Sequence, residues 1–183
     1  MVISQREIKG VFEIQMEPKR DNRGFFMKTY DDATFEKFSL NKTWLQEYRS
    51  FSKEKHTLRG LHLQLEPFAE TKMIQVISGE IFDVFVDLRK DSATFGKWGS
   101  AILSEENKKM MYIPRGFAHA FLTLTENTQV LCKMDNYYSF EAEKQIAYND
   151  PDLHIQWPLS LLPILSKKDA QAMSLKEFIK TCT

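Results

Sequence analysis

The chain has 183 residues, of which 43% are hydrophobic and 13% aromatic, enough to bury the core of one domain. Its 25 basic and 25 acidic residues balance, so no net field attracts nucleic acid or an anionic membrane. No apolar run reaches the ~18 residues of a membrane span, and the first residues lack the apolar core of a signal peptide. We therefore expect a single cytoplasmic domain over residues 1–183, with no nucleic-acid or membrane partner.

The chain contains two cysteines, Cys132 and Cys182. Neither has a second cysteine or a histidine at the spacing of a zinc site, and two distant cysteines do not make a disulfide framework. Reduced thiols are the simpler prediction. A balanced charge still allows a local basic cluster to bind an anionic small molecule.

Strand signals dominate the sequence, and helical signals are confined to its ends. A short helix is expected at residues 32–38. Runs rich in β-branched and aromatic residues then follow, closed by turn signals such as Pro114-Arg115-Gly116. These predicted strands cover residues 72–77, 81–88, 98–103, 109–113, 118–125 and 128–136. The first two flank Ser78-Gly79 and predict a hairpin.

The last predicted element is a helix over residues 167–183. Five apolar residues there predict a stripe that covers the sheets: Ala170, Met173, Leu175, Phe178 and Ile179. The sequence has no fixed-period repeat, no low-complexity stretch and no linker that would divide it. Many short strands at this spacing predict a β-sandwich or a barrel.

Two histidines lie within predicted strands, His62 in the segment LRGLHLQ and His119 in IPRGFAHAF. A single strand histidine is more often a satisfied core or surface residue than a base. Two imidazoles on neighbouring strands would form a polar cluster in an apolar pocket, where a base with a near-neutral pKa is useful. A metal-binding barrel needs closely spaced histidines with a carboxylate, and Leu63-Gln64 after His62 supplies none. We therefore predict no metal.

The most specific signal is a set of segments in a fixed order. They are DNRGFF (21–26), LRGLHLQ (58–64), GEIFDVFVDLR (79–89), TFGKW (94–98), IPRGFAHAF (113–121) and NDPDL (149–153). Together they resemble the dTDP-4-dehydrorhamnose 3,5-epimerases over nearly the whole chain, although any one segment would be weak evidence. The resemblance implies an all-β cupin or jelly-roll β-sandwich with a few short flanking helices, mostly C-terminal, and no cofactor. It also implies a homodimer that exchanges N-terminal strands.

The resemblance further implies epimerisation of a nucleotide-linked 4-keto-6-deoxy sugar. Its C3 and C5 protons flank the ketone, so removing either one gives an enolate. This chemistry needs a base on one face, a cation or donor at the C4 oxygen, and an acid or water on the other face. By resemblance His62 is the base, Asp169 is the carboxylate that orients it, and Lys72 lies at the enolate oxygen. A solvated strand-end lysine and a helix N-terminal aspartate are the alternatives for Lys72 and Asp169.

Substrate-binding residues follow from the same resemblance. Arg23 and Arg59 match the arginines that hold the pyrophosphate, for which guanidinium geometry is suited. Four further residues match positions that line the sugar and nucleotide: Gln46, His119, Tyr138 and Glu143. Arg23 could equally be a surface charge, and Tyr138 a strand aromatic.

Three departures from the family pattern bear on specificity. Cys132 stands where the family usually has a tyrosine, Lys28 where it has glutamate, and Tyr48-Arg49 where it has asparagine-histidine. A reversed charge at Lys28 and a larger side chain at Tyr48 put thymine recognition in doubt. A guanosine diphosphate sugar becomes credible, as in the relatives that act on GDP-6-deoxy-4-keto-heptoses for capsular polysaccharide.

Cys132 also bears on which carbon is inverted. A free cysteine is commonly a small buried hydrophobe. A thiol is acidic enough to donate a proton, but it reaches less far than a tyrosine hydroxyl. We hypothesise inversion at C3, with solvent or Cys132 returning the proton, and weak or lost inversion at C5.

Three alternatives stay open at this point. One is a full 3,5-epimerase acting on dTDP-4-keto-6-deoxyglucose or on a GDP-4-keto-heptose. A cupin sugar 3,4-ketoisomerase would use similar proton abstraction and return the proton elsewhere. The third is a nucleotide-sugar binding protein whose catalysis has decayed, against which the trio His62, Lys72 and Asp169 argues.

Overall fold

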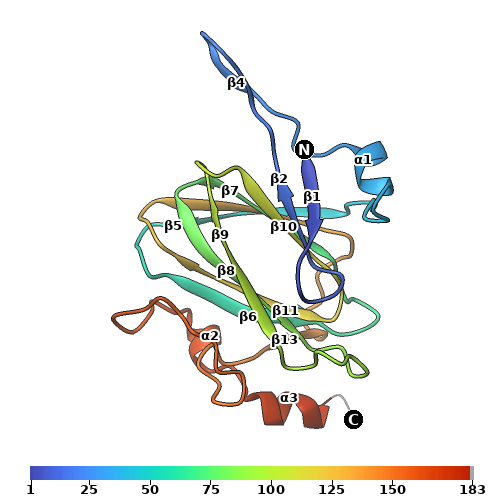
Figure 1. The fold of residues 1–183 in the computed structure, drawn as a ribbon. Coiled ribbons are helices and arrows are strands. Elements are labelled where there is room, and N and C mark those ends of the chain that lie inside the picture. Colours follow the sequence, from blue (N-terminus) through green and yellow to red (C-terminus); the bar gives the residue numbers. More distant parts are fainter. Residues whose placement is uncertain (182–183) are drawn as a thin grey trace.

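A computed structural model describes residues 1–181 and confirms the predicted β-sandwich (Figure 1). One sheet has six strands, in the order β1 (Val2–Gln5), β2 (Phe12–Gln15), β10 (Lys109–Ile113), β7 (Lys72–Ser78), β12 (Thr128–Met134) and β5 (Gln46–Ser52). The other has five, in the order β13 (Glu143–Gln145), β6 (Leu58–Gln64), β11 (Phe117–Thr123), β8 (Glu80–Asp87) and β9 (Trp98–Ser104). All strand pairs within these sheets are antiparallel.

The main core lies between the two sheets, because alternate residues of each strand point to opposite faces. On β7 and β8 these inward residues are Ile74, Val76, Ile81 and Phe85, all buried in one cluster with residues of β10, β11 and β12. A second cluster lies on the outer face of the five-stranded sheet, where Phe178 packs. The strands that are buried on both faces therefore carry nearly continuous apolar runs.

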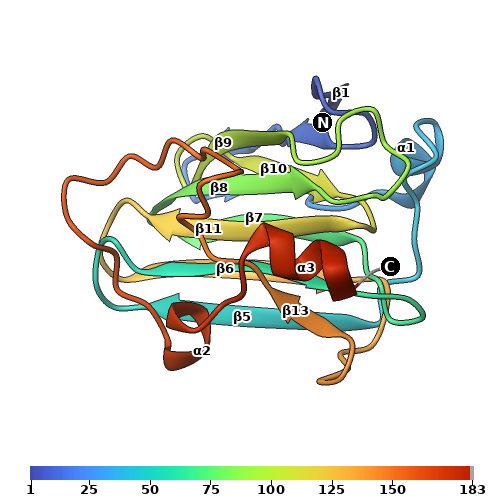
Figure 2. The ribbon, with the colours of Figure 1, turned by 90° about the horizontal axis from the view of Figure 1, so that it is seen from below.

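Three short helices flank the sandwich. They are α1 (Asp32–Glu36), α2 (Lys167–Ala170) and α3 (Leu175–Thr181). The side chain of Asp31 caps α1 by accepting a hydrogen bond from the backbone N–H of Thr34. Seen from below, α2 and α3 lie in front of the five-stranded sheet (Figure 2). Within residues 1–181, no helix is long and apolar enough to cross a membrane.

The predicted hairpin around Ser78-Gly79 is wrong. Strands β7 and β8 are consecutive, but β7 pairs with β10 and β12, whereas β8 pairs with β11 and β9. Gly79, at a φ of +82°, instead turns the chain from one sheet to the other. Apolar residues on both faces of each strand predicted strands correctly, but they could not identify the partners.

The predicted C-terminal helix is also interrupted. Residues 171–174 separate α2 from α3, since Met173 forms a bridge with Ile146 and its N–H binds the carbonyl of Gln145. Ser174 then starts α3, exchanging hydrogen bonds with Glu177 as a capping box. Ile179 is exposed, so the predicted stripe is only partly buried; residues 182–183, with Cys182, lie outside the described part.

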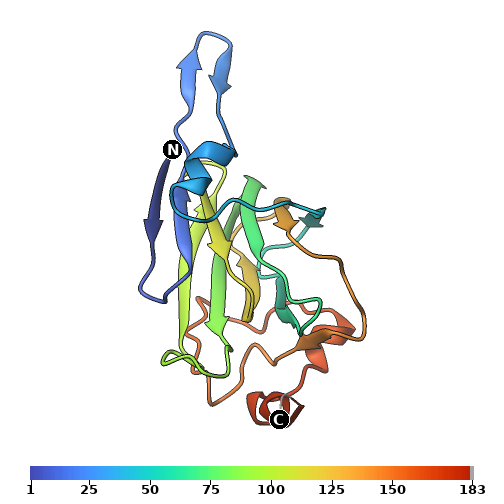
Figure 3. The same ribbon diagram turned by 90° about the vertical axis from the view of Figure 1, so that its right-hand side faces the viewer.

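A hairpin near the N-terminus projects away from the sandwich. It consists of β3 (Lys19–Asp21) and β4 (Gly24–Phe26), which pair only with each other. Figures 1 and 3 show this arm extending beyond the body, at the end opposite to the C-terminal helices. Phe26, on the arm, is 77% exposed. In a single chain the arm therefore leaves apolar surface in solvent.

Candidate active site

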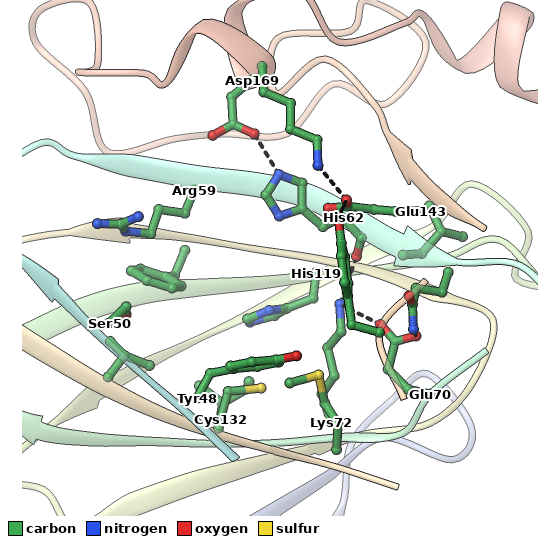
Figure 4. A pocket seen from close by; sticks show the side chains of 18 of the residues that line it. Tyr48, Ser50, Arg59, His62, Glu70, Lys72, His119, Cys132, Glu143 and Asp169 are labelled. Atoms are coloured by element: carbon green, nitrogen blue, oxygen red, sulfur yellow. Dashed lines mark hydrogen bonds and ion pairs between the residues drawn. The ribbon is translucent and has the colours of Figure 1, made fainter. Parts of the chain in front are cut away.

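A cavity of about 520 Å³ opens between the two sheets (Figure 4). This volume is typical of small-molecule sites. The five-stranded sheet contributes Arg59, His62 and His119, and the six-stranded sheet contributes Tyr48, Ser50, Lys72 and Cys132. A flat ligand bound here would have histidines on one face and the lysine, tyrosine and thiol on the other.

A β-bulge in β6 directs two of these side chains into the cavity. Arg59 and His62 are three positions apart, so a regular strand would point them to opposite faces. The pairing of β6 with β11 shifts register between His119 and Phe121, which pair with His62 and Arg59. Gly60 permits this shift: its φ is +115°, and a Cβ there would lie 2.5 Å from the carbonyl oxygen of His119.

His62 is held by the carboxylate predicted from the sequence. Its Nε2 lies 2.5 Å from Oδ1 of Asp169, which α2 supplies. Ser166 caps α2, and its hydroxyl donates to Oδ2 of Asp169. Burial alone would raise the pKa of Asp169, but the hydrogen bonds from His62 and Ser166 outweigh it and hold that pKa below its ordinary value.

This contact determines which nitrogen of His62 faces the cavity. An ionised Asp169 accepts a hydrogen bond from the Nε2–H of His62, so the neutral ring carries its lone pair on Nδ1. Figure 4 shows the second ring nitrogen pointing away from Asp169 and into the cavity. The geometry therefore presents Nδ1 as the atom able to take a proton.

Lys72 reaches into the cavity from the opposite sheet. Its ammonium nitrogen is 3.2 Å from Oε1 of Glu70 and donates to the backbone carbonyl of His62 at 3.0 Å. Gln64 binds the other oxygen of Glu70 at 2.8 Å. Lys72 is 8% exposed, so its charge is buried with a partner and close to the backbone of the histidine. An ammonium group has three protons, so at least one remains for a ligand oxygen.

A second histidine–carboxylate pair lies beside the first. Nε2 of His119 is 2.6 Å from Oδ1 of Asp83, and both residues are buried. Asp83 comes from the inward face of β8, between Ile81 and Phe85, and within residues 1–181 its Oδ2 has no partner. This carboxylate fixes the orientation of His119.

Polar residues at the cavity mouth form a third group. Tyr138 donates to Glu143 at 2.7 Å, and Lys168 forms a short ion pair with the same carboxylate. Burial alone would raise the pKa of Glu143, but these two partners hold it below its ordinary value. Gln46 does not line the cavity; its side chain accepts from the N–H of Tyr138 and so supports this group.

Arg59 lies in another part of the cavity lining. Its guanidinium donates to the carbonyl of Phe51 at 3.0 Å and to the hydroxyl of Ser52 at 3.2 Å. Neither partner is charged, so the full positive charge remains available to an anion.

Cys132 and Tyr48 are direct neighbours on the floor of the cavity. They pair in register between β12 and β5, and both line the cavity. Cys132 is partly buried, and burial raises the pKa of its thiol to about 12. Arg49 lies outside the cavity lining and binds Gln129 at 2.8 Å.

Two residues predicted to bind substrate lie outside the cavity of their own chain. Arg23 is at the tip of the arm, 2.6 Å from Asp21, and the side chain of Lys28 is 2.6 Å from Asp31. The remaining predicted residues, except Gln46, all line the cavity.

Sequence reasoning missed three charged residues of the lining or its support, namely Glu70, Asp83 and Lys168. A signal existed for Asp83, since it is the one carboxylate in the run from Ile81 to Val86, which is otherwise apolar. Glu70 and Lys168 carried no such signal. Among residues 1–181, no group of three or more His, Cys, Asp or Glu side chains is arranged to hold a metal ion.

Comparison with known proteins shows the family of the chain. Residues 5–177 match the family model described as dTDP-4-dehydrorhamnose 3,5-epimerase. The chain belongs to this family. The enzyme of that name from Salmonella typhimurium is 44% identical over 99% of both chains. Like the family, the chain is an isomerase that acts on sugar nucleotides as an epimerase.

Solved structures of epimerases superpose closely on this member of the family. The dTDP-4-dehydrorhamnose 3,5-epimerase of Bacillus anthracis, with TDP and pyrophosphate bound, has a TM-score of 0.92 at 40% identity, covering 95% of this chain and 99% of its own. A 3'-monoepimerase from Streptomyces bikiniensis in complex with dTDP-quinovose has a TM-score of 0.90 at 28% identity, covering 97% and 89%. The structural similarity therefore extends both to an enzyme named as a 3,5-epimerase and to one named as a 3'-monoepimerase.

Proposed function

We propose that this chain inverts C3 of a 4-keto-6-deoxy sugar carried on a nucleoside diphosphate, with weak or no inversion at C5. One observation supports this proposal more strongly than the others. The His62–Asp169 pair and Lys72 approach one cavity from opposite sheets. A base and a cation in this relation suit proton removal next to a ketone.

The mechanism starts at Nδ1 of His62. This nitrogen takes the C3 proton, and the electron pair of the broken C–H bond moves into the ketone to form an enolate. Asp169 stabilises the imidazolium, and Lys72 donates a hydrogen bond to the developing oxyanion. A proton returned from the face of the six-stranded sheet then gives the inverted carbon. Arg59 binds the diphosphate, and His119, Tyr138 and Glu143 contact the sugar nucleotide.

The restriction to C3 rests on Cys132. Its thiol is short, and burial holds its proton tightly. The test is incubation of 4-keto sugar nucleotides in heavy water, with deuterium at C3 and C5 followed by NMR. Equal and stereochemically productive uptake at both carbons would instead favour the 3,5-epimerase. A product with its ketone at another carbon would favour a ketoisomerase.

Replacing Cys132 with Tyr is expected to raise turnover at C5 by about 10²-fold, the contribution typical of a placed general acid. The hydroxyl would reach farther into the cavity than the thiol does. Cys132→Phe is the matched control, since it adds the same ring without a proton to donate. The assigned restriction would be wrong if the tyrosine and phenylalanine variants gave the same C5 rate in the deuterium assay.

The nucleotide is the second part of the proposal. The departures at Lys28 and Tyr48 support a guanosine diphosphate sugar, including a 6-deoxy-4-keto-heptose of capsular polysaccharide. The dTDP-linked hexose acted on by named relatives is the alternative. A panel of dTDP- and GDP-linked 4-keto sugars in the same assay separates them. A cytoplasmic location stays a prediction from the sequence.

The arm supports a homodimer that exchanges N-terminal segments. It is exposed, apolar at Phe26 and carries Arg23 away from its own cavity. Placed over a partner's cavity, Arg23 would add a second cation for the diphosphate, and the exposed phenylalanine would become buried.

Subunit complementation tests this exchange. Arg23→Ala and His62→Asn proteins are each expected to be nearly inactive, but refolding them together gives mixed dimers in which one site has both wild-type residues. A random mixture should recover about a quarter of the wild-type activity. No recovery, with mixed dimers verified by differential tagging, would mean that Arg23 acts within its own chain or not at all.

A further inference from the structure

Inversion at C3 requires a proton donor on the face opposite His62, a role for which the sequence suggested solvent or Cys132. If His62 removes the proton from one face, a proton returned by the same imidazole restores the original configuration. Inversion therefore depends on a group of the six-stranded sheet or on water. Such a donor is required only if the chain has the proposed function.

Four side chains of that sheet with exchangeable protons line the cavity: Tyr48, Ser50, Lys72 and Cys132. Lys72 is already held by Glu70 and by the carbonyl of His62, in the position suited to the oxyanion. Ser50 carries an alcohol, which is a weak acid. Burial raises the pKa of the Cys132 thiol to about 12, so this thiol releases its proton poorly.

The geometry of Tyr48 differs from that of the other three. Its ring is the cross-strand neighbour of Cys132, and Figure 4 shows its hydroxyl directed along the floor toward Lys72. Opposite residues in an antiparallel pair have Cβ atoms ~5 Å apart, so Tyr48 and Cys132 serve almost the same region of the cavity. Within residues 1–181 the hydroxyl has no protein hydrogen-bond partner, and the residue is 44% exposed.

We propose that Tyr48 is the proton donor to C3, working from β5 next to the small Cys132 side chain of β12. The Tyr48 O–H bond breaks and its proton forms the new C3–H bond on the face opposite His62. The O–H electron pair stays on the phenolate oxygen, while the enolate pair forms the C–H bond and the C4 carbonyl is restored. Water then reprotonates the phenolate, and His62 releases its proton to solvent, so no net charge or atom is gained.

The two sequence departures at positions 48 and 132 thus meet at one rung of the β5–β12 ladder. A small residue at 132 leaves room for the ring of Tyr48 to lie over the floor. The side chain that donates the proton therefore comes from strand β5 and not from strand β12.

The test is Tyr48→Phe, which removes only the hydroxyl, assayed in heavy water with a substrate that the wild type inverts. Two products are measured by NMR: the C3 epimer, and starting material that has acquired deuterium at C3 with its configuration retained. The variant should keep exchange, because His62 still abstracts and returns a hydron. Its ratio of epimer to exchanged starting material should fall by about 10²-fold.

Tyr137→Phe is the matched control, since Tyr137 loses the same hydroxyl but lies outside the cavity lining and is 58% exposed. Continued exchange in the Tyr48→Phe protein also verifies a folded site. An unchanged ratio in that protein would overturn the assignment of Tyr48, as would a loss of inversion that follows Cys132→Ala instead. A wild type that takes up no deuterium from any 4-keto sugar nucleotide would overturn the proposed function itself, and the donor assignment with it.

Discussion

Replacing His62 with Asn should lower deuterium exchange at C3 by about 10³-fold, because a general base is lost. The side chain of asparagine is polar and smaller than that of histidine, ends short of the position of Nε2, and has an amide nitrogen without a basic lone pair. Affinity for the nucleoside diphosphate should change by less than about threefold, because Arg59 is held by its own hydrogen bonds to Phe51 and Ser52 and does not depend on His62. Exchange is measured by NMR and affinity by calorimetry.

The control for this variant is His154→Asn. His154 is exposed, lies outside the cavity lining and has a φ of 51°, a conformation that asparagine tolerates. If His62→Asn retained wild-type exchange, the base would have to be another residue, with His119 as the next candidate. A wild type that binds nucleotide sugars without any exchange would favour the decayed binding protein.

Replacing Lys72 with Gln should lower the exchange rate by about 10²- to 10³-fold, the cost of removing one donor to an oxyanion. The variant should also be less stable, because Glu70 would keep a buried charge without its cation. Removing one member of a buried ion pair lowers the free energy of unfolding by about 3–5 kcal/mol. The rate is measured by NMR and the free energy of unfolding by urea titration.

A double variant separates these two effects. In Lys72→Gln with Glu70→Gln neither side chain is charged, and Gln64 can still donate to the new amide oxygen at position 70. Most of the lost stability should return, whereas exchange should stay low because the cation at the enolate oxygen is absent. Recovery of both stability and exchange would mean that Lys72 serves only the fold.

Much of the fold followed from local sequence. Apolar and β-branched runs predicted most of the strands of the two sheets, and six segments in a fixed order together resembled the family whose model matches residues 5–177. The main errors in the fold concerned partners. β7 and β8 were predicted to pair because only Ser78-Gly79 separates them, but side chains buried on both faces allow either a hairpin or a crossing between sheets. The predicted C-terminal helix is interrupted at Met173, which forms a bridge with Ile146, a residue distant from it in the sequence.

In the candidate site, too, some features followed from the sequence and others only from the tertiary structure. The sequence by itself determined the family and the sandwich class, because these depend on residue types in a fixed order, and the resemblance made His62, Lys72 and Asp169 the candidate catalytic residues. Only the tertiary structure decided that Asp169 contacts Nε2 of His62, that Asp83 supports His119, and that Tyr48 lies opposite Cys132. Such relations depend on the bulge at Gly60 and on the register between distant strands, and neither is encoded in the neighbouring residues of any one segment.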